Sequence, residues 1–478
     1  MDCPEILANC RAHDSEIPIS LLTTRGAPGI KINVRHMSTT TAQTRVDWSL
    51  IWSQRGFRYF FLAMFVSLFG SGMNFTGVSW YILSETHSTI KVSLQVIVVT
   101  LPGLFVPFVG GVLIDRLDRR YLGVLLDFLR GGVVLATAYI AWRGRLELWH
   151  LYLMTLITGA GSAMYWATVN ALVQEVIPPS QFTGANAAVL IGVQSGMMIA
   201  GAFVGFIYDS AGISGILGID GLTYIVSALC LYQMRRGYVS PRSHQSQSRE
   251  YSEATDTTSQ GLETTENPEV AEAGLSLALY KDMKEGFAYL KTQPKVLAVG
   301  VTHAALMAGV VSANVVLVAL ANDLLHSGAR GLGYLEAAWA LGAVSGGLVA
   351  SQLSGAWRMT MYVWAIAFLA TGHLFAPLVS FMLGAATLQA VFGFCRSISG
   401  VVSQSTLMSI VPRHFMGRTQ SAIAIVTTAL QLLMSFSLGW IAQRVSLFAG
   451  FALLAAMYTG AGLFASRAKQ LLSGQRLT

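Results

Sequence analysis

The sequence predicts an all-α, polytopic membrane protein with about twelve transmembrane helices in two six-helix bundles. The chain has 478 residues, of which 53% are hydrophobic and 12% are charged, whereas soluble domains carry roughly twice that charged fraction. Its apolar residues come in blocks long enough to cross a membrane, which takes roughly 20 residues. The blocks also lack the alternation of transmembrane strands. Such a chain is expected to place its apolar surface in lipid.

The apolar blocks form two groups of six, separated by a polar segment. The first group lies at 58–84, 93–114, 122–142, 149–176, 183–209 and 215–234. The second group lies at 296–322, 331–353, 359–375, 377–411, 419–442 and 447–466. The block at 377–411 is long enough to include a tight connection or a strongly tilted helix. We therefore expect an N-terminal bundle over 58–234 and a C-terminal bundle over 296–466.

Polar segments flank the two bundles. Residues 1–57 lack the compact basic and apolar regions of a secretory signal, and a cytoplasmic tail is expected there. Met37 opens a polar stretch typical of a true N-terminus, so residues 1–36 are hypothesised to be an upstream extension. A disordered tail is the equal alternative. A second cytoplasmic tail is expected at 467–478.

The segment 235–295 joins the bundles and differs from them in composition. Its first part, 237–274, is rich in Ser, Thr, Glu and Gln and is expected to be disordered. Beyond it, apolar residues recur at helical spacing among lysines, namely Leu279, Met283, Phe287 and Leu290. This spacing predicts an amphipathic helix on the cytoplasmic membrane surface. A partner-binding helix is the less favoured alternative.

Lys and Arg are distributed unevenly between alternate connections of the apolar blocks. Basic connections stay in the cytoplasm, and one set of connections holds most of the basic residues. With an even number of spans, both termini are therefore expected to be cytoplasmic. The net charge of +7 follows from this topology and needs no nucleic-acid partner. The sparse set contains Lys91, Arg143, Arg145, Arg330 and Arg444.

The connection after the second apolar block carries a specific motif. From Gly111 to Arg120 the chain reads GVLIDRLDRR. This stretch resembles the signature loop of the major facilitator superfamily, Gly-x-Leu-x-Asp-Arg-x-Gly-Arg-Arg/Lys, with Asp118 in place of the second Gly. The variant is similar to the branch that contains macrolide-efflux proteins and the enterobactin exporter. The resemblance implies two six-helix bundles and secondary transport.

The same loop has the chemistry of a conformational latch. Gly111 lets two helices approach closely, and Asp115 can pair with arginines and with the positive N-terminal dipole of a neighbouring helix. The resemblance implies that Asp115 faces the helix beginning near Gly417. An ordinary basic loop is the alternative. The expected latch residues are Gly111, Asp115, Arg116, Arg119 and Arg120.

Two patterns that the resemblance associates with proton coupling are incomplete. The stretch from Gly201 to Gly205 resembles the antiporter motif Gly-Pro-x-x-Gly, but Ala202 replaces the Pro. Thr155 stands where proton-coupled members of the family carry an intramembrane Arg. Proton antiport is therefore an expectation that the residues support only in part. The fifth block also has a small-residue face suited to helix packing, formed by Gly192, Gly196, Gly201 and Gly205.

Ionisable residues inside apolar blocks are costly and are candidates for proton or substrate binding. Asp127 and Arg130 are three residues apart, which favours an ion pair on one helix face. Glu336 stands among Ala and Leu with no charge nearby in sequence, and it is the leading candidate for a proton or cation site. Arg396 could pair with Glu336, contact an anionic substrate or reach an interface. Asp220, beside two glycines, could equally mark a helix bend.

Other classes of protein lack the parts that they need in this sequence. The chain contains no Gly-x-x-x-x-Gly-Lys-Ser/Thr loop, which excludes an ATP-driven pump with its own nucleotide domain. The four cysteines form no close metal-binding pair, and no clustered nucleophile and base indicates an enzyme. No metal or cofactor is therefore expected. A receptor or scaffold that has lost transport is a remaining alternative.

The resemblance and the apolar helices together predict a secondary active transporter of the plasma membrane, which in bacteria is the inner membrane. The favoured function is proton-coupled efflux of a hydrophobic or amphipathic small molecule, such as a drug, macrolide or siderophore, by alternating access. A cavity lined by Phe, Met and Leu would suit that substrate. An importer of a small metabolite is the alternative. A monomer in the lipid bilayer is expected.

Overall fold

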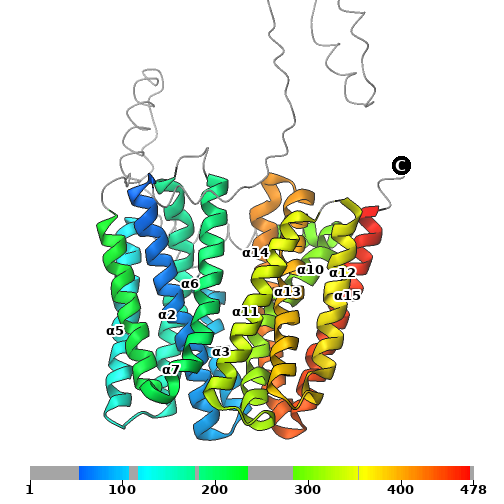
Figure 1. The fold of residues 1–478 in the computed structure, drawn as a ribbon. Helices are drawn as coiled ribbons and strands as arrows, with labels where there is room; N and C mark the ends of the chain where they lie inside the picture. Colours follow the sequence, from blue (N-terminus) through cyan, green and yellow to red (C-terminus); the bar gives the residue numbers. More distant parts are fainter. Residues whose placement is uncertain (1–52, 107–116, 178–181, 235–283, 354, 474–478) are drawn as a thin grey trace, which may run out of the picture. The chain divides into compact units, whose positions relative to one another are not determined.

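The computed structural model describes residues 53–106, 117–177, 182–234, 284–353 and 355–473, without the side chains of some residues between 170 and 198 and at 355, 356, 413 and 414. Long helices make up almost all of this part of the chain, and it contains no strand (Figure 1). Helices satisfy every backbone N–H and C=O group within the segment, as a membrane interior requires. The all-α fold class predicted from the sequence is confirmed.

The first bundle consists of five continuous helices in the described residues. They are α2 (Arg55–Thr86), α3 (Thr89–Thr100), α5 (Arg119–Trp142), α6 (Leu148–Val176) and α7 (Phe182–Gln233). The long helix α7 is interrupted at Gly212, whose φ of 62° and ψ of −173° are not helical. Glycine adopts such a positive φ without steric cost. The break divides α7 into the fifth and sixth predicted spans.

The second bundle consists of six long helices and two short turns. They are α10 (Pro294–Ala319), α11 (Gly328–Gln352), α12 (Gly355–Phe375), α13 (Met382–Ile410), α14 (Arg413–Arg444) and α15 (Leu447–Ser473). A π-helical turn, η3 (Leu320–Leu324), extends α10, and a 3-10 turn, η4 (Ala376–Leu378), precedes α13. The long predicted block 377–411 thus contains the expected tight connection before its helix.

The helices account for the predicted number of spans. With α7 counted as two, the described helices α2 to α15 provide twelve spans. Ten helical stretches of the described residues are long and apolar enough by themselves to cross a membrane. Large apolar side chains such as Leu341, Trp357 and Leu383 are exposed, as expected for surfaces in contact with lipid.

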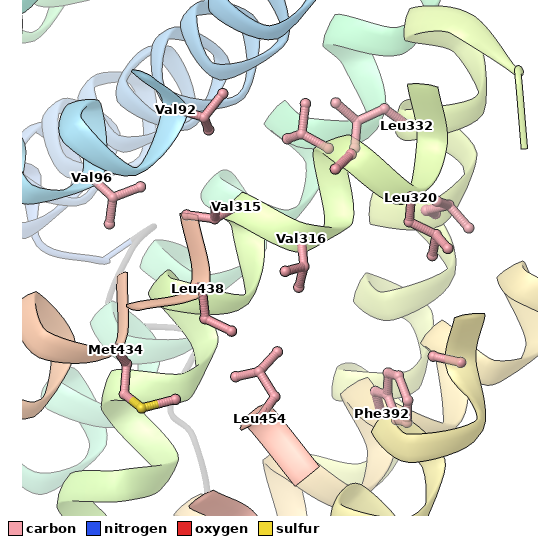
Figure 2. Close-up of a cluster of buried hydrophobic side chains, with 14 of the residues drawn as sticks. Val92, Val96, Val315, Val316, Leu320, Leu332, Phe392, Met434, Leu438 and Leu454 are labelled. Carbon is pink, nitrogen blue, oxygen red and sulfur yellow. The ribbon is translucent and has the colours of Figure 1, made fainter. Parts of the chain in front are cut away.

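The two bundles share a core at one end and have separate cores at the other. We call the end at which α2 begins and α15 ends the linker end, and the opposite end the far end (Figure 1). The largest apolar cluster contains Val92 of α3, Val315 of α10 and Leu438 of α14, and so includes both bundles. Figure 2 shows these side chains around the meeting point of the three helices.

Separate apolar clusters occupy the linker end of each bundle. One cluster comes from the first bundle alone and includes Phe60 of α2 and Leu122 of α5. Another includes Val299 of α10 and Ala422 of α14, from the second bundle. The described core therefore joins the bundles toward the far end and leaves each with its own core at the linker end.

The described part of the predicted amphipathic helix is helical over residues 284–292. It packs against the start of α14: Tyr289 stacks on Phe415 with ring centroids 4.7 Å apart, and Glu285 pairs with Arg418 at 2.7 Å. Leu290 joins the linker-end core of the second bundle. The helical part of the prediction is confirmed for residues 284–292, and its apolar face packs on α14. The position on the cytoplasmic membrane surface stays a prediction.

Candidate functional site

A cavity of about 220 Å³ lies between the two bundles. Its lining includes Phe75 and Thr76 of α2 from the first bundle and residues of α10, α11, α12, α13 and α15 from the second. Most of the lining is apolar or aromatic. Polar groups enter at a few positions, which is the usual composition of a small-molecule site. The polar lining residues of the second bundle include Asn314, Glu336, His373, Gln389 and Arg396.

Glu336 projects from α11 into this cavity next to a glycine of α7. A Cβ at Gly201 would lie 3.0 Å from the Cβ of Glu336 and 3.2 Å from its Oε2. Within the described part of the chain, the carboxylate of Glu336 forms no hydrogen bond or ion pair. Because Gly201 has no side chain, it leaves room for the carboxylate of Glu336, which has no fixed protein partner.

Arg396 of α13 lines the same cavity but is held by α10. Its Nε donates to the carbonyl oxygen of Leu306 at 3.1 Å, and Nη2 lies 3.0 Å from the sulfur of Met307. Arg396 and Glu336 do not form an ion pair in the described structure. The cavity thus contains a basic and an acidic side chain that are not paired with each other, so the possible pairing considered from the sequence is absent.

Aromatic side chains form one wall of the cavity beside Arg396. The ring of His373 stacks on Phe392 at 4.0 Å and lies 5.0 Å from the ring of Tyr458. Nδ1 of His373 donates to the carbonyl oxygen of Leu369 at 2.7 Å. This bond fixes the imidazole in the tautomer that leaves Nε2 as an acceptor. The wall offers flat apolar faces next to a cation.

A second polar cluster is buried in the first bundle. Asp127 and Arg130 of α5 form an ion pair and are almost fully buried. Ser227 of α7 donates to Asp127 at 2.6 Å. The guanidinium of Arg130 lies over the rings of Tyr165 at 4.3 Å and Tyr224 at 4.5 Å, so aromatic faces add cation–π attraction to the ion pair.

Asp220 of α7 belongs to the same cluster. Asn74 of α2 donates to its carboxylate at 2.7 Å, and Thr223 donates to its backbone carbonyl at 2.7 Å. A side chain at Gly70 would collide with Thr223 and Asp220, so this glycine permits the approach of α2 to α7. Asp220 is fully buried and lies within helix, while the break in α7 occurs at Gly212. The bend considered from the sequence is therefore not at Asp220.

Sequence reasoning did not identify the uncharged members of this cluster. Asn74, Tyr165 and Tyr224 are polar groups within apolar blocks, as is Ser71, whose hydroxyl lies 2.9 Å from that of Tyr224. The polar Asn74 in the middle of an apolar block was the feature of the sequence that could have indicated this cluster. Their common position could not be recognised because they come from helices that are distant in the chain.

The glycines of the predicted packing face lie in the first part of α7, where they contact neighbouring helices. Gly192 lies against the ring of Phe61 and Gly196 against the backbone of Phe65, both in α2. Gly205 crosses Gly333 of α11, where a Cβ on Gly333 would lie 2.6 Å from the Cα of Gly205. This face therefore contacts α2 of the first bundle and α11 of the second.

Further contacts join the bundles toward the far end. Asp209 of α7 pairs with Arg330 of α11 at 2.8 Å. Thr89 of α3 donates through Oγ1 to the carbonyl oxygen of Gly439 in α14 at 2.8 Å, and its backbone N–H donates to Gln443 at 2.8 Å. These bonds lie on the same side of the membrane-spanning helices as the shared core.

The predicted latch loop is described only in part. Gly111, Asp115 and Arg116 lie outside the described residues. Asp118 caps α5 by accepting hydrogen bonds from the backbone N–H groups of Arg120 at 3.0 Å and Tyr121 at 3.4 Å. Arg119 begins the helix, and the buried Arg120 lies 4.4 Å from the ring of Tyr121. The departure from the signature at Asp118 thus supplies an N-cap.

Comparisons with known proteins agree on one family. The model of the Major Facilitator Superfamily matches residues 60–437. The enterobactin exporter EntS of Salmonella typhi is 27% identical over 383 residues, which cover 78% of this chain and 82% of EntS. An uncharacterised transporter of the same superfamily, YkuC of Bacillus subtilis, is 26% identical over 187 residues, or 39% of this chain and 43% of YkuC.

Solved structures share the fold at low sequence identity. A POT family transporter in complex with a thioalcohol-conjugated peptide has a TM-score of 0.61 and 11% identity, covering 89% of this chain and 97% of that one. The nucleoside transporter NupG has a TM-score of 0.61 and 12% identity, with coverage of 86% and 99%. These similarities concern the fold alone.

Proposed function

Because the chain belongs to the major facilitator superfamily, whose model matches residues 60–437, we propose that it exports a hydrophobic or amphipathic small molecule in exchange for protons. The observation that carries this proposal is the cavity between the bundles, where Glu336 and Arg396 stand unpaired with each other among apolar and aromatic groups. Such a cavity suits a mainly apolar substrate that bears a few polar or charged groups.

Alternating access is supported by the unequal contacts of the two ends. The bundles share an apolar core and an ion pair toward the far end, while each has its own core at the linker end. Basic connections are concentrated at the linker end, so we place that end and both termini in the cytoplasm. The structure then corresponds to a state closed on the outside, and export requires the far-end contacts to separate.

The proposed substrate class follows from the aromatic wall and the two charges. The stacked His373 and Phe392 suit an aromatic or macrocyclic compound, and Arg396 can donate hydrogen bonds to an anionic or carbonyl oxygen. EntS, a relative whose match covers 78% of this chain, is named for enterobactin. We therefore favour an amphipathic compound of siderophore, macrolide or drug type.

Glu336 is proposed as the group at which proton and substrate binding meet. It lines the cavity and has no fixed partner in the described structure. A buried carboxylate without a counter-charge is costly, and a proton or a substrate cation would remove that cost. Exchange between these occupants would couple efflux to proton entry across the plasma membrane, with the protein acting as a monomer.

The proposed latch acts at the linker end of the two bundles. Asp115, with arginines of its loop, would hold the linker ends together when the transporter opens outward, by pairing with the N-terminal dipole of α14. We include Arg119 and Arg120, at the start of α5, in the proposed latch. An importer of a small metabolite would use the same loop, and it remains the second candidate.

A panel efflux assay tests the proposal. Cells that express the protein are loaded with fluorescent lipophilic compounds and with a siderophore, and efflux is followed with and without a proton uncoupler. Uncoupler-sensitive efflux of at least one compound, lost in a Glu336→Gln variant, is the expected result. Energised inverted vesicles that accumulate no lipophilic compound, together with cellular uptake of a polar metabolite, would instead establish the importer.

A further inference from the structure

The buried cluster of the first bundle contains more acidic than basic groups. Asp127 forms an ion pair with Arg130, and the same guanidinium also interacts electrostatically with the more distant carboxylate of Asp220. Asp127 and Asp220 are fully buried, and Arg130 is nearly so. We infer that this cluster is a proton-binding site, in which Asp220 holds one proton while Asp127 and Arg130 remain an ion pair.

Charge balance is the first reason for a bound proton. If both carboxylates were ionised, the cluster would keep one uncompensated negative charge away from water. Such a charge is strongly unfavourable in a protein interior, and a carboxyl group placed there binds a proton instead. The described residues supply no second basic side chain to either carboxylate. One proton therefore restores neutrality.

The geometry assigns that proton to Asp220. Asp127 has the ion pair with Arg130 and accepts a hydrogen bond from Ser227 at 2.6 Å. Both interactions favour its ionised form. The carboxyl group of Asp220 instead meets the neutral amide of Asn74 at 2.7 Å. Because the ionised form of Asp127 is the better stabilised, Asp220 is the group that becomes neutral.

Asn74 is suited to both protonation states of its partner. A side-chain amide presents two N–H donors and one carbonyl acceptor. It can donate to the ionised carboxylate and, after its amide has turned over, accept from the carboxylic acid. Asp220 can therefore gain or lose a proton without leaving a buried polar group unsatisfied, which a purely structural carboxylate would not need.

The surroundings of Asp220 contain few other titratable groups. From α2 come the neutral Ser71 and Asn74, from α6 Tyr165, and from α7 itself Tyr224, whose phenol contacts Ser71 at 2.9 Å. Phenols remain neutral under ordinary conditions. The charge state of the cluster is therefore decided by Asp127, Arg130 and Asp220.

Helix α2 connects this site with the cavity. Asn74 faces Asp220, and on the same helix Phe75 and Thr76 line the cavity. A change in the Asn74–Asp220 contact would therefore bear on the helix that forms one side of the cavity. This consequence rests on the proposed proton-coupled transport, whereas the proton-binding site itself does not.

Infrared spectroscopy of the purified, full-length protein in detergent at neutral pH detects the bound proton directly. A protonated carboxyl group has a separate carbonyl stretching band that shifts when water is exchanged for deuterium oxide. All measurements use the Glu336→Gln background, so that the cavity acid makes no contribution. Asp209→Asn, which removes an exposed carboxylate, is the matched control and should leave the band unchanged.

Three variants should each change the intensity of this band in a defined direction. Asp220→Asn should abolish the band. Asp127→Asn should also abolish it although Asp220 is still present, because Arg130 then neutralises Asp220 in its ionised form. Arg130→Gln should roughly double it, since both carboxylates then lose their counter-charge.

A band that survives Asp220→Asn, or keeps its intensity in Asp127→Asn, would overturn the proposal. Size-exclusion chromatography shows whether Arg130→Gln folds. If it does not fold, the results for Asp220→Asn and Asp127→Asn still test the proposal. The infrared experiment does not measure transport. It can therefore contradict the proton-binding site while the efflux assay supports the proposed function, and the reverse.

Discussion

Asp209 and Arg330 form an ion pair between α7 and α11, with 2.8 Å between the carboxylate oxygen and Nε. Along the same two helices follow the crossing of Gly205 with Gly333 and then the contact of Gly201 with Glu336. One helix pair thus carries an exposed charge pair, a close backbone approach and the acidic group of the cavity. Under the proposed alternating access, opening the far end would separate all three.

Charge reversal at the exposed ion pair should shift the balance between the two conformations. Arg330 and Asp209 have side-chain exposures of 65% and 49%, and exposed pairs contribute about 0.2–1 kcal/mol. Asp209→Arg or Arg330→Asp should therefore favour the proposed state that is open at the far end by up to about fivefold, and the double swap should restore the original balance. Distances between spin labels at the far ends of α2 and α12 would measure the shift. Additive effects of the two substitutions would contradict the pairing.

A larger side chain at the helix crossing should prevent closure of the far end. A Cβ on Gly333 would lie 2.6 Å from the Cα of Gly205, so Gly333→Leu has no room unless α7 and α11 move apart. We expect transport to fall at least tenfold while membrane abundance stays near normal. Gly218→Ala is the matched control, because no atom lies within 4 Å of a Cβ at that site. Equal activity of both variants would rule out a tight crossing.

Glu336→Gln should remove the pH dependence of efflux if Glu336 carries the coupled proton. Glutamine keeps the size of the side chain but cannot bind or release a proton in this range. Initial efflux rates measured over a pH series would show a flat profile in the variant. Glu147→Gln, at an exposed position, serves as the control. An unchanged profile would move the coupling site to Asp127 or Asp220.

Arg396→Gln should weaken recognition of anionic substrates more than of neutral ones. The guanidinium is anchored by Leu306 and Met307 of α10, and one charge-assisted hydrogen bond is worth about 1.5–3 kcal/mol. The concentration for half-maximal efflux of an anionic compound should therefore rise roughly tenfold to a hundredfold. Arg444→Gln, at an exposed helix end, is the control. An equal loss for neutral compounds would indicate a structural role.

Asp115→Asn should weaken the proposed latch and impair transport without reducing membrane abundance. The substitution removes the charge that would meet the N-terminal dipole of α14. Asp118→Ala tests the same connection for stability alone, because it removes the N-cap of α5 and should cost about 0.5–2 kcal/mol. Full activity of Asp115→Asn in the efflux assay would contradict the latch.

The spans were predictable because lipid imposes one rule on every segment. Each apolar block must satisfy its own backbone groups, so block length and composition suffice to place a helix. The packing of residues 284–292 on α14 was not predictable in this way. A helix with one apolar face can lie on lipid or on protein, and the choice depends on Phe415 and Arg418, which are distant in the chain.

The sequence by itself determined the two six-helix bundles and the few ionisable residues inside them, because both follow from the cost of polar groups in an apolar medium. Only the tertiary structure decided which of these residues meet. Arg130 lies beside its close neighbour Asp127 and also near Asp220, whereas Glu336 and Arg396 share a cavity without pairing. These relationships depend on how helices cross, and contacts such as Gly205 with Gly333 fix those crossings.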